Sequence, residues 1–561
     1  MSRNVLARVL LWGGGAVLLL CAAVPAAALA KRYGEMIELE LTAQRQYANP
    51  FADVRVEAVF TAPSGKQRTA LGFYDGGQTW RVRFRPDETG RWRWRAASQP
   101  EDPGLCTAGE LTVARLSDKP RFLLATPGVG WGFCYSTGEP CFLLGETFYN
   151  IFGVAYCAKS LDEAVAPLLR RRAEQGFNIF RARCQVSPQH PKSPKNVWQT
   201  RPLWPWGGTR QNPQLDRLNL EWFRTVDKVL RLAESLDVGF EMILEAWGFE
   251  FPFNNRKVFT EELERLWLGY CVARWDAFAS VYVWTLMNEY EYYPDGKFSY
   301  NKEADEWALR TARWLKSIAP HGHIVAVHNG PRKPPFAQRF AADPGAIDAI
   351  MFQEWGSTGK DNAWLAAGLE ENAAESLAGW PGSAMLVEYG YERSLEVDCL
   401  PPWHQYLFVD HTRRGAWRGA FCGLCVGNGF AFTWGPYFIA DHDMPGVAQL
   451  ALVKKFFVQV MPFAALRPAP ELVAPANYPV GGKPLCLADK QRFEVAVYLP
   501  VGGAVKLNLP RGRQYNAYWF DPRTGELRPA RGSPEQGFSA PRGAGEHPED
   551  WVLVLTQRTL R

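Results

Sequence analysis

The sequence has few of the residues that metal sites and nucleic-acid surfaces need. Only eight histidines occur in 561 residues, and none falls in an HExxH pattern. The eleven cysteines are scattered and form no pair of closely spaced pairs, the arrangement typical of zinc sites. A net charge of +5 is too small for this length to indicate nucleic-acid binding. We therefore expect no metal, no cofactor and no nucleic-acid partner.

Long apolar runs are absent after residue 30. Before it, Arg3 and Arg8 introduce the run VLLWGGGAVLLLCAAVPAAALA, which ends in small residues. This pattern predicts a signal peptide over residues 1–30 and export to the periplasm or the cell exterior. The run is also long enough for an uncleaved signal anchor, which stays the alternative. In an exported chain, Cys134 and Cys141 are spaced to allow a disulfide across a turn.

Residues 31–117 alternate apolar and polar side chains and predict an N-terminal β-sandwich. Within it, the segment RVRFRPDETGRWRWR (81–95) looks basic enough for nucleic acid. Its period of two instead indicates a hairpin that turns at 87–90 and exposes its arginines to solvent. The side chains expected on its buried face are Val82, Phe84, Trp92 and Trp94.

From residue 118 to 465, short apolar strands alternate with amphipathic helices such as 220–236, 261–279 and 448–461. Eight such units predict an α/β fold, a (β/α)₈ TIM barrel. The strands are expected at 141–146, 177–183, 240–245, 281–287, 323–328, 347–353, 384–388 and 430–434. A Pro-rich linker and renewed alternation predict a C-terminal β-sandwich over residues 466–561.

Carboxylates gather at the carboxyl ends of the predicted strands, where barrels of this kind carry their chemistry. Glu289 and Glu388 end the fourth and seventh strands, as the acid/base and nucleophile of glycoside hydrolysis require. Glu354 is expected to support the site or bind substrate. The other strand-end residues that we expect to contact substrate are Glu146, Arg181, Trp247, Asn288, His328, Gln353 and Trp434. Abundant aromatic residues (14%) fit sugar stacking, although a large aromatic core accounts for most of them.

The motifs LMNEY, MLVEYG and GFNIFRA resemble those of retaining glycoside hydrolases of clan A. The resemblance implies that Glu289 is the acid/base and Glu388 the nucleophile, that Arg181 supports Glu388 and that Trp434 is a platform for the sugar. It also implies that Asn288 binds the sugar 2-hydroxyl. Three tyrosines after Glu289 are expected either to contact substrate or to pack within their loop: Tyr290, Tyr292 and Tyr293.

The ends of the chain extend this resemblance. NPFADVRVEAVFTAPSG resembles DUF5060 sandwiches, FLLGETFYNIF resembles the opening of DUF4038 or apiosidase-like barrels, and the tail resembles a collagen-binding-type domain. Glu146 replaces the usual first-strand aspartate, and Gln353-Glu354-Trp355 stands where His-x-Tyr is common. The expected function is a secreted retaining glycoside hydrolase acting on an oligo- or polysaccharide of plant or microbial origin. The alternative is a non-catalytic carbohydrate-binding or scaffold protein with an inactive barrel.

Overall fold

The computed structural model describes most of the chain. The described residues are 29–31, 35–116, 119, 121–128, 131–185, 199–356, 364–392, 407–430, 433, 443–542 and 547–560. Trp434 and residues 1–28, which hold most of the predicted signal peptide, lie outside them. In the described part of the chain, no helix combines the length and apolar character that crossing a membrane requires.

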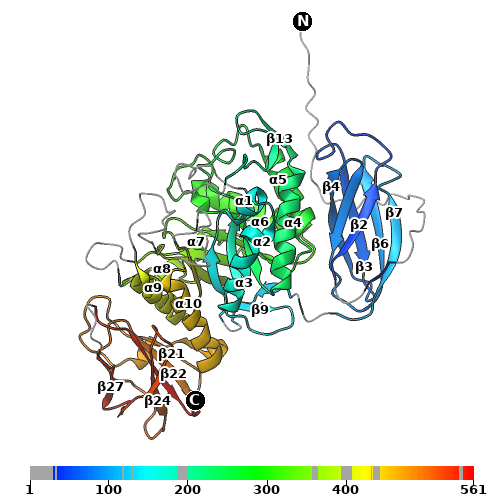
Figure 1. The fold of residues 1–561 in the computed structure, drawn as a ribbon. Helices are drawn as coiled ribbons and strands as arrows, with labels where there is room; N and C mark the ends of the chain where they lie inside the picture. The colour runs from blue at the N-terminus through cyan, green and yellow to red at the C-terminus, as the bar shows by residue number, and fades with distance from the viewer. Residues whose placement is uncertain are drawn as a thin grey trace.

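The N-terminal β-sandwich, blue in Figure 1, is one sheet that folds over on itself. The first half of β4 (Gln67–Gly76) pairs with β3 (Arg55–Thr61), and its second half pairs with β5 (Thr79–Phe84). The rings of Phe60 and Phe84 stack between the two halves, with centroids 4.1 Å apart. The other strands are β1 (Leu29–Lys31), β2 (Ile37–Thr42), β6 (Gly90–Gln99) and β7 (Thr107–Val113).

The hairpin predicted over residues 81–95 is wrong. β5 pairs with β2 and β4, whereas β6 pairs with β3 and β7, so the turn at 87–90 crosses between the two layers. The predicted apolar face is correct, since these side chains are all buried: Val82, Phe84, Trp92 and Trp94. Arg83 and Arg85 were expected in solvent but are buried, because this side of β5 lies against barrel helices.

Eight parallel strands close into a barrel, which confirms the predicted fold class. The first strand pairs with the last, as Leu144 opposite Val426 shows. The strands are β10 (Leu144–Thr147), β11 (Ile179–Arg183), β14 (Gly239–Glu245), β15 (Val281–Met287), β16 (Ile324–His328), β17 (Ala349–Gln353), β18 (Ser383–Glu388) and β19 (Cys425–Asn428).

The predicted eighth strand, 430–434, is wrong. Its aromatic residues and threonine have high strand propensity, but the register with β10 and β18 selects the preceding segment Cys425–Asn428. Cys425 lies in that strand as a free thiol, and Cys134 and Cys141 are also free.

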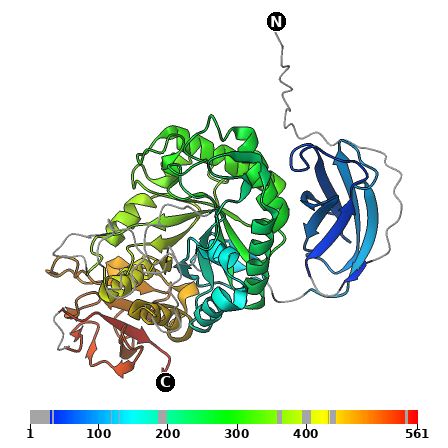
Figure 2. The same cartoon turned by 45° about the horizontal axis from the view of Figure 1, so that its top comes forward.

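Helices surround the strands, as Figure 2 shows. The helices are α1 (Ile151–Cys157), α2 (Leu161–Ala164), α3 (Ala166–Glu174), α4 (Leu220–Ser235), α5 (Glu261–Trp275), α6 (Lys302–Ile318), α7 (Phe336–Arg339), α8 (Leu369–Ser376), α9 (Val409–Phe421) and α10 (Pro445–Lys455). A π-helical turn, Phe456–Val460, extends α10. Two short antiparallel pairs lie beside the barrel: β8 (Leu123–Ala125) with β9 (Phe133–Tyr135), and β12 (Trp206–Gly208) with β13 (Pro213–Leu218).

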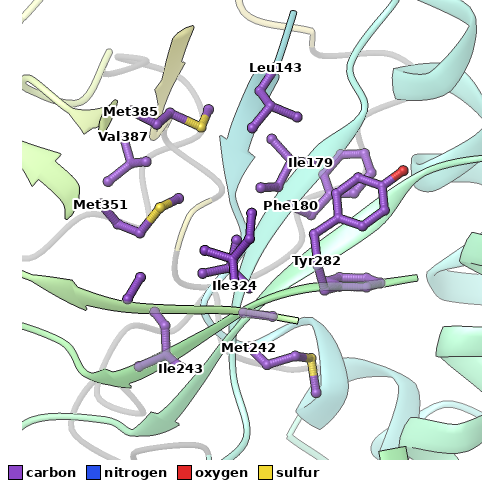
Figure 3. Close-up of a cluster of buried hydrophobic side chains, with 14 of the residues drawn as sticks. Leu143, Ile179, Phe180, Met242, Ile243, Tyr282, Ile324, Met351, Met385 and Val387 are labelled. Atoms are coloured by element: carbon purple, nitrogen blue, oxygen red, sulfur yellow. The ribbon is translucent and has the colours of Figure 1, made fainter. Parts of the chain in front are cut away.

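Apolar side chains fill the barrel interior (Figure 3). They include Ile179, Ile324, Met351, Met385 and Val387, all buried. A filled interior leaves the carboxyl ends of the strands as the place for chemistry.

The C-terminal β-sandwich, orange to red in Figure 1, packs against α9 and α10. Its larger sheet has the order β20 (Arg467–Pro468), β21 (Leu485–Ala488), β22 (Glu494–Leu499), β28 (Trp551–Thr556), β24 (Asn516–Phe520) and β25 (Leu527–Pro529). Its smaller sheet has the order β23 (Ala504–Val505), β27 (Gly537–Ser539) and β26 (Gly532–Ser533). Arg413 of α9 donates to the buried Asp550, whose other oxygen accepts from Tyr498, so the contact is ionic as well as apolar.

Candidate active site

Glu289 is the second residue after β15 and has an uncommon backbone conformation. Its φ of 50° and ψ of 63° are left-handed, a region that costs a non-glycine residue about 1–2 kcal/mol. Its backbone N–H donates to Nδ1 of His328 at 3.1 Å, which helps to hold this conformation. Residues kept in such conformations by their surroundings are frequent at active sites.

The carboxyl group of Glu289 accepts hydrogen bonds at both oxygens. Nε2 of Gln353 donates to Oε1 at 2.6 Å, and Nε1 of Trp247 donates to Oε2 at 2.9 Å. Burial and the nearby charge of Glu388 outweigh these bonds and raise the pKa of Glu289 to about 8. Glu289 is therefore mostly protonated at neutral pH, as a general acid must be.

Glu388 ends β18 in surroundings of a different kind. The hydroxyl of Tyr149 donates to its Oε2 at 3.0 Å, and Nη1 of Arg181 lies 3.3 Å from the same oxygen. The arrangement suits a carboxylate that acts as a nucleophile.

His328, at the end of β16, lies close to the backbone of Glu289 and to the carboxylate of Glu388. Because its Nδ1 accepts from the backbone N–H of Glu289, the proton of the neutral ring belongs on Nε2. Nε2 lies 3.8 Å from Oε2 of Glu388. Burial and the charge of Arg181 lower the pKa of His328 well below 6.5, so the ring is neutral and points an N–H at Glu388.

Arg181 of β11 connects the nucleophile to a buried polar layer below it. Its Nη2 donates to Oδ1 of Asn288 at 2.7 Å, and its Nε lies 3.1 Å from Oε2 of Glu241. The hydroxyl of Thr285 donates to the other oxygen of Glu241 at 2.9 Å. Asn288 is thereby oriented by the same arginine that contacts Glu388.

Most of the predicted site residues thus lie together. The residues connected by these contacts are Glu289, Glu388, Asn288, Arg181, Trp247, His328 and Gln353. Trp434 lies outside the described residues.

Other strand-end carboxylates have different partners. Glu146 is ion-paired with Arg172 of α3, and its neighbour Thr147 accepts from Arg181 instead. Since successive strand residues point to opposite faces, Glu146 lies towards the helices, and its contact with substrate stays a prediction. Glu245 is bound by Arg256, and Glu354 by Asn372.

Loop packing accounts for two of the three tyrosines after Glu289. Tyr290 donates to Asp305 at 2.6 Å, and Tyr293 stacks on Trp307 with centroids 4.8 Å apart. Tyr292 is partly exposed and packs against Phe249.

Two contributors were missed by the sequence-based prediction. Tyr149 lies in the loop after β10, and Glu241 lies inside β14, where a charged residue within an apolar run was an available signal.

Three protein families match separate parts of the chain. They are described as "Domain of unknown function (DUF5060)" for residues 31–99, "Apiosidase-like, catalytic domain" for 131–436, and "Putative collagen-binding domain of a collagenase" for 468–556. These matches confirm the resemblance that the motifs indicated. No curated protein matches the chain.

Solved structures share the fold. A "putative glycoside hydrolase" from Bacteroides vulgatus ATCC 8482 has a TM-score of 0.69 and 18% identity, with 94% of this chain and 99% of that chain covered. A "glycoside hydrolase family 5" protein from the same organism has a TM-score of 0.58 and 16% identity, with 78% and 93% covered.

Proposed function

The chain belongs to the family of apiosidase-like catalytic domains, and from this we propose that it is a glycoside hydrolase that retains anomeric configuration. One observation carries the proposal: Glu289 and Glu388 occupy unlike surroundings at the ends of β15 and β18, two strands that β16 and β17 separate. Burial keeps Glu289 neutral, while Tyr149 and Arg181 donate to Glu388. One carboxyl group therefore has a proton to give and the other has an electron pair to share.

In the first step, Glu388 attacks the anomeric carbon while Glu289 protonates the departing glycosidic oxygen. A covalent glycosyl-enzyme and a free alcohol result. In the second step, the Glu289 carboxylate takes a proton from water, and the hydroxide oxygen displaces Glu388 from the same carbon. Tyr149 and Arg181 hold Glu388 between the steps by hydrogen bonds, and Asn288 binds the 2-hydroxyl.

The substrate and the cellular site are also proposals. The family description makes apiosyl glycosides the first substrates to test, within glycans of plant or microbial origin. Export is supported by the leader-like pattern of residues 1–30.

Rescue by azide tests the two roles separately. Glu388→Ala should lose at least about 10³-fold in rate, and azide should restore turnover and give a glycosyl azide of inverted configuration. Glu289→Ala should still react with a substrate whose leaving group needs no proton, and azide should give the retained product. Glu146→Ala, a strand-end control outside the pair, should gain nothing from azide.

Proton NMR of the first product gives the stereochemistry directly. A product of inverted configuration from the wild-type enzyme would refute the retaining mechanism. It would also contradict the expected separation of about 5–5.5 Å between the two carboxyl groups.

A further inference from the structure

Aromatic rings lead away from the acid/base to the surface of the barrel mouth. Trp247, which donates to Glu289, stacks on Phe249 with centroids 5.6 Å apart and an interplanar angle of 20°. Phe249 meets Tyr292 edge-on at 4.8 Å, and Tyr292 lies 5.0 Å from Phe298. Exposure rises along the series, from buried Trp247 to Phe298, which is 51% exposed.

Close backbone contacts hold these rings in place. A Cβ on Gly330 would lie 2.2 Å from the ring of Phe298, so the glycine allows the ring to lie directly on the loop after β16. A Cβ on Gly248 would lie 2.6 Å from the backbone of Tyr292. Phe298 is therefore supported on one side while half of its surface faces solvent. The ring of Phe298 extends the partly exposed rings of Phe249 and Tyr292 into one apolar patch, and a contiguous apolar patch on the surface indicates a binding site.

The position of the rings identifies what they contact. Glu289 protonates the oxygen of the leaving group, so the leaving group must lie beside Glu289. It lies on the side of Glu289 that is farther from Glu388. Phe249, Tyr292 and Phe298 lie on the loops after β14 and β15. Trp247 and Glu289 are each the second residue of one of these loops, and Trp247 donates to Glu289. Burial, and after it the charge of nearby Glu289, raises the pKa of Tyr292.

We propose that Phe249, Tyr292 and Phe298 form a leaving-group subsite that stacks against the ring of a sugar. This proposal rests on the proposed function and extends it, since it implies that the natural leaving group is itself a sugar residue. The apolar face of a sugar ring matches an aromatic surface, whereas its hydroxyls stay hydrated at the rim.

Two substrates separate the subsite from the chemistry. One is a glycoside whose leaving group is a sugar, and the other is the corresponding glycosyl fluoride, whose leaving group has no ring to stack. Phe298→Ala should lower kcat/KM for the first by about 10- to 100-fold, since burying one large apolar side chain contributes on this order. It should leave kcat/KM for the fluoride within about twofold, and Phe298→Trp should keep both. Phe493→Ala removes a ring of comparable exposure (40%) from the C-terminal sandwich and should change neither rate.

Transfer to an added sugar gives a second measurement, because an acceptor occupies the same position as the leaving group. With the fluoride as donor, Phe298→Ala should lower the ratio of transfer to hydrolysis. Equal losses on both substrates, or no loss on the sugar glycoside, would overturn the subsite alone. A wild-type enzyme that cleaves neither substrate would overturn the proposed function and the subsite with it.

Discussion

Glu289 combines a left-handed backbone with a carboxyl group whose pKa burial and Glu388 raise to about 8. Both features are costly to a folded protein, and both serve a group that must deliver a proton at neutral pH. The surroundings of this one side chain therefore affect the rate and the stability in opposite ways.

The first prediction concerns the rate. As pH rises through about 8, Glu289 loses its proton, so kcat/KM for glycosides with sugar leaving groups should fall. The same limb should be absent with a glycosyl fluoride, because fluoride departs without protonation. Two pH–rate profiles on the wild-type enzyme are sufficient. If kcat/KM falls at the same pH and by the same factor with both substrates, the assignment of Glu289 as the general acid is contradicted.

The second prediction concerns stability. Folding raises the pKa of Glu289 from 4.5 to about 8, so the folded state binds more protons between these values. The stability tied to the neutral carboxyl is complete below about 4.5 and is lost as pH rises through about 8. Glu289→Gln cannot ionise, so its gain in Tm over the wild type should be larger at pH 9 than at pH 4. A gain that is independent of pH would show that the carboxyl group is not perturbed.

The third prediction uses the buried pair of Arg181 and Glu241. Arg181→Met leaves Glu241 buried without its guanidinium and should cost about 3–5 kcal/mol of unfolding free energy. Adding Glu241→Gln removes the isolated charge and should recover part of that loss in urea titrations. Activity should stay low in both variants, because Glu388 and Asn288 have lost their shared donor. If the double variant recovers no unfolding free energy, the loss of the ion pair with Glu241 is not what destabilises Arg181→Met.

At the scale of elements, a side chain at the end of a barrel strand points either into the barrel or towards the surrounding helices. Only a side chain that points inward reaches the site. In β10, Thr147 contacts Arg181 while Glu146 contacts Arg172 of α3. The same Arg172 lies 2.7 Å from Asp443, just before α10, so this strand end connects the first and last units of the barrel.

The fourth prediction follows from the direction of the Glu146 side chain towards the helices. Glu146→Gln should lower Tm, because it removes a buried charge that balances Arg172. It should leave kcat/KM within a few-fold, since the side chain faces the helices. Glu146→Asp, which keeps the negative charge on a shorter side chain, should recover part of the Tm. A selective rise in KM without loss of Tm would return Glu146 to the substrate site.

At the scale of the whole molecule, the N-terminal sandwich is attached to the barrel by buried charge. Nη2 of Arg83 lies 2.8 Å from Asp227 of α4, and its Nη1 donates to the carbonyl of Arg274 on α5. Arg85 reaches Glu234 at 2.8 Å. Such pairs fix the relative position of two domains because each charge is costly to leave without its partner.

The fifth prediction tests this attachment. Arg83→Met should cost about 3–5 kcal/mol and should split or broaden the thermal transition, because Asp227 loses a partner and the sandwich loses a contact. Arg91→Met, on the next strand with a side chain 70% exposed, should change the free energy of unfolding by less than about 1 kcal/mol. Turnover should persist in both folded variants, because all the site residues lie in the barrel. A single unchanged transition for Arg83→Met would contradict the role of this pair.

The sequence alone determined the class of the fold and the position of the proposed catalytic pair. The strand 281–287 was predicted with its observed bounds, because an uninterrupted apolar run bounded by polar residues is a local property. Residues at the ends of such runs must lie at the mouth of a parallel barrel, so Glu289 and Glu388 were found without a structure.

Only the tertiary structure decided the directions and partners of side chains. Contacts between distant segments turn Glu146 towards α3 and set which nitrogen of His328 carries the proton. Such contacts also bring Tyr149 to Glu388. The burial of Arg83 and the crossing of layers between β5 and β6 depend on neighbours that local alternation does not specify. A period of two gives the two faces of a strand, but what covers each face is set by the packing of the whole chain.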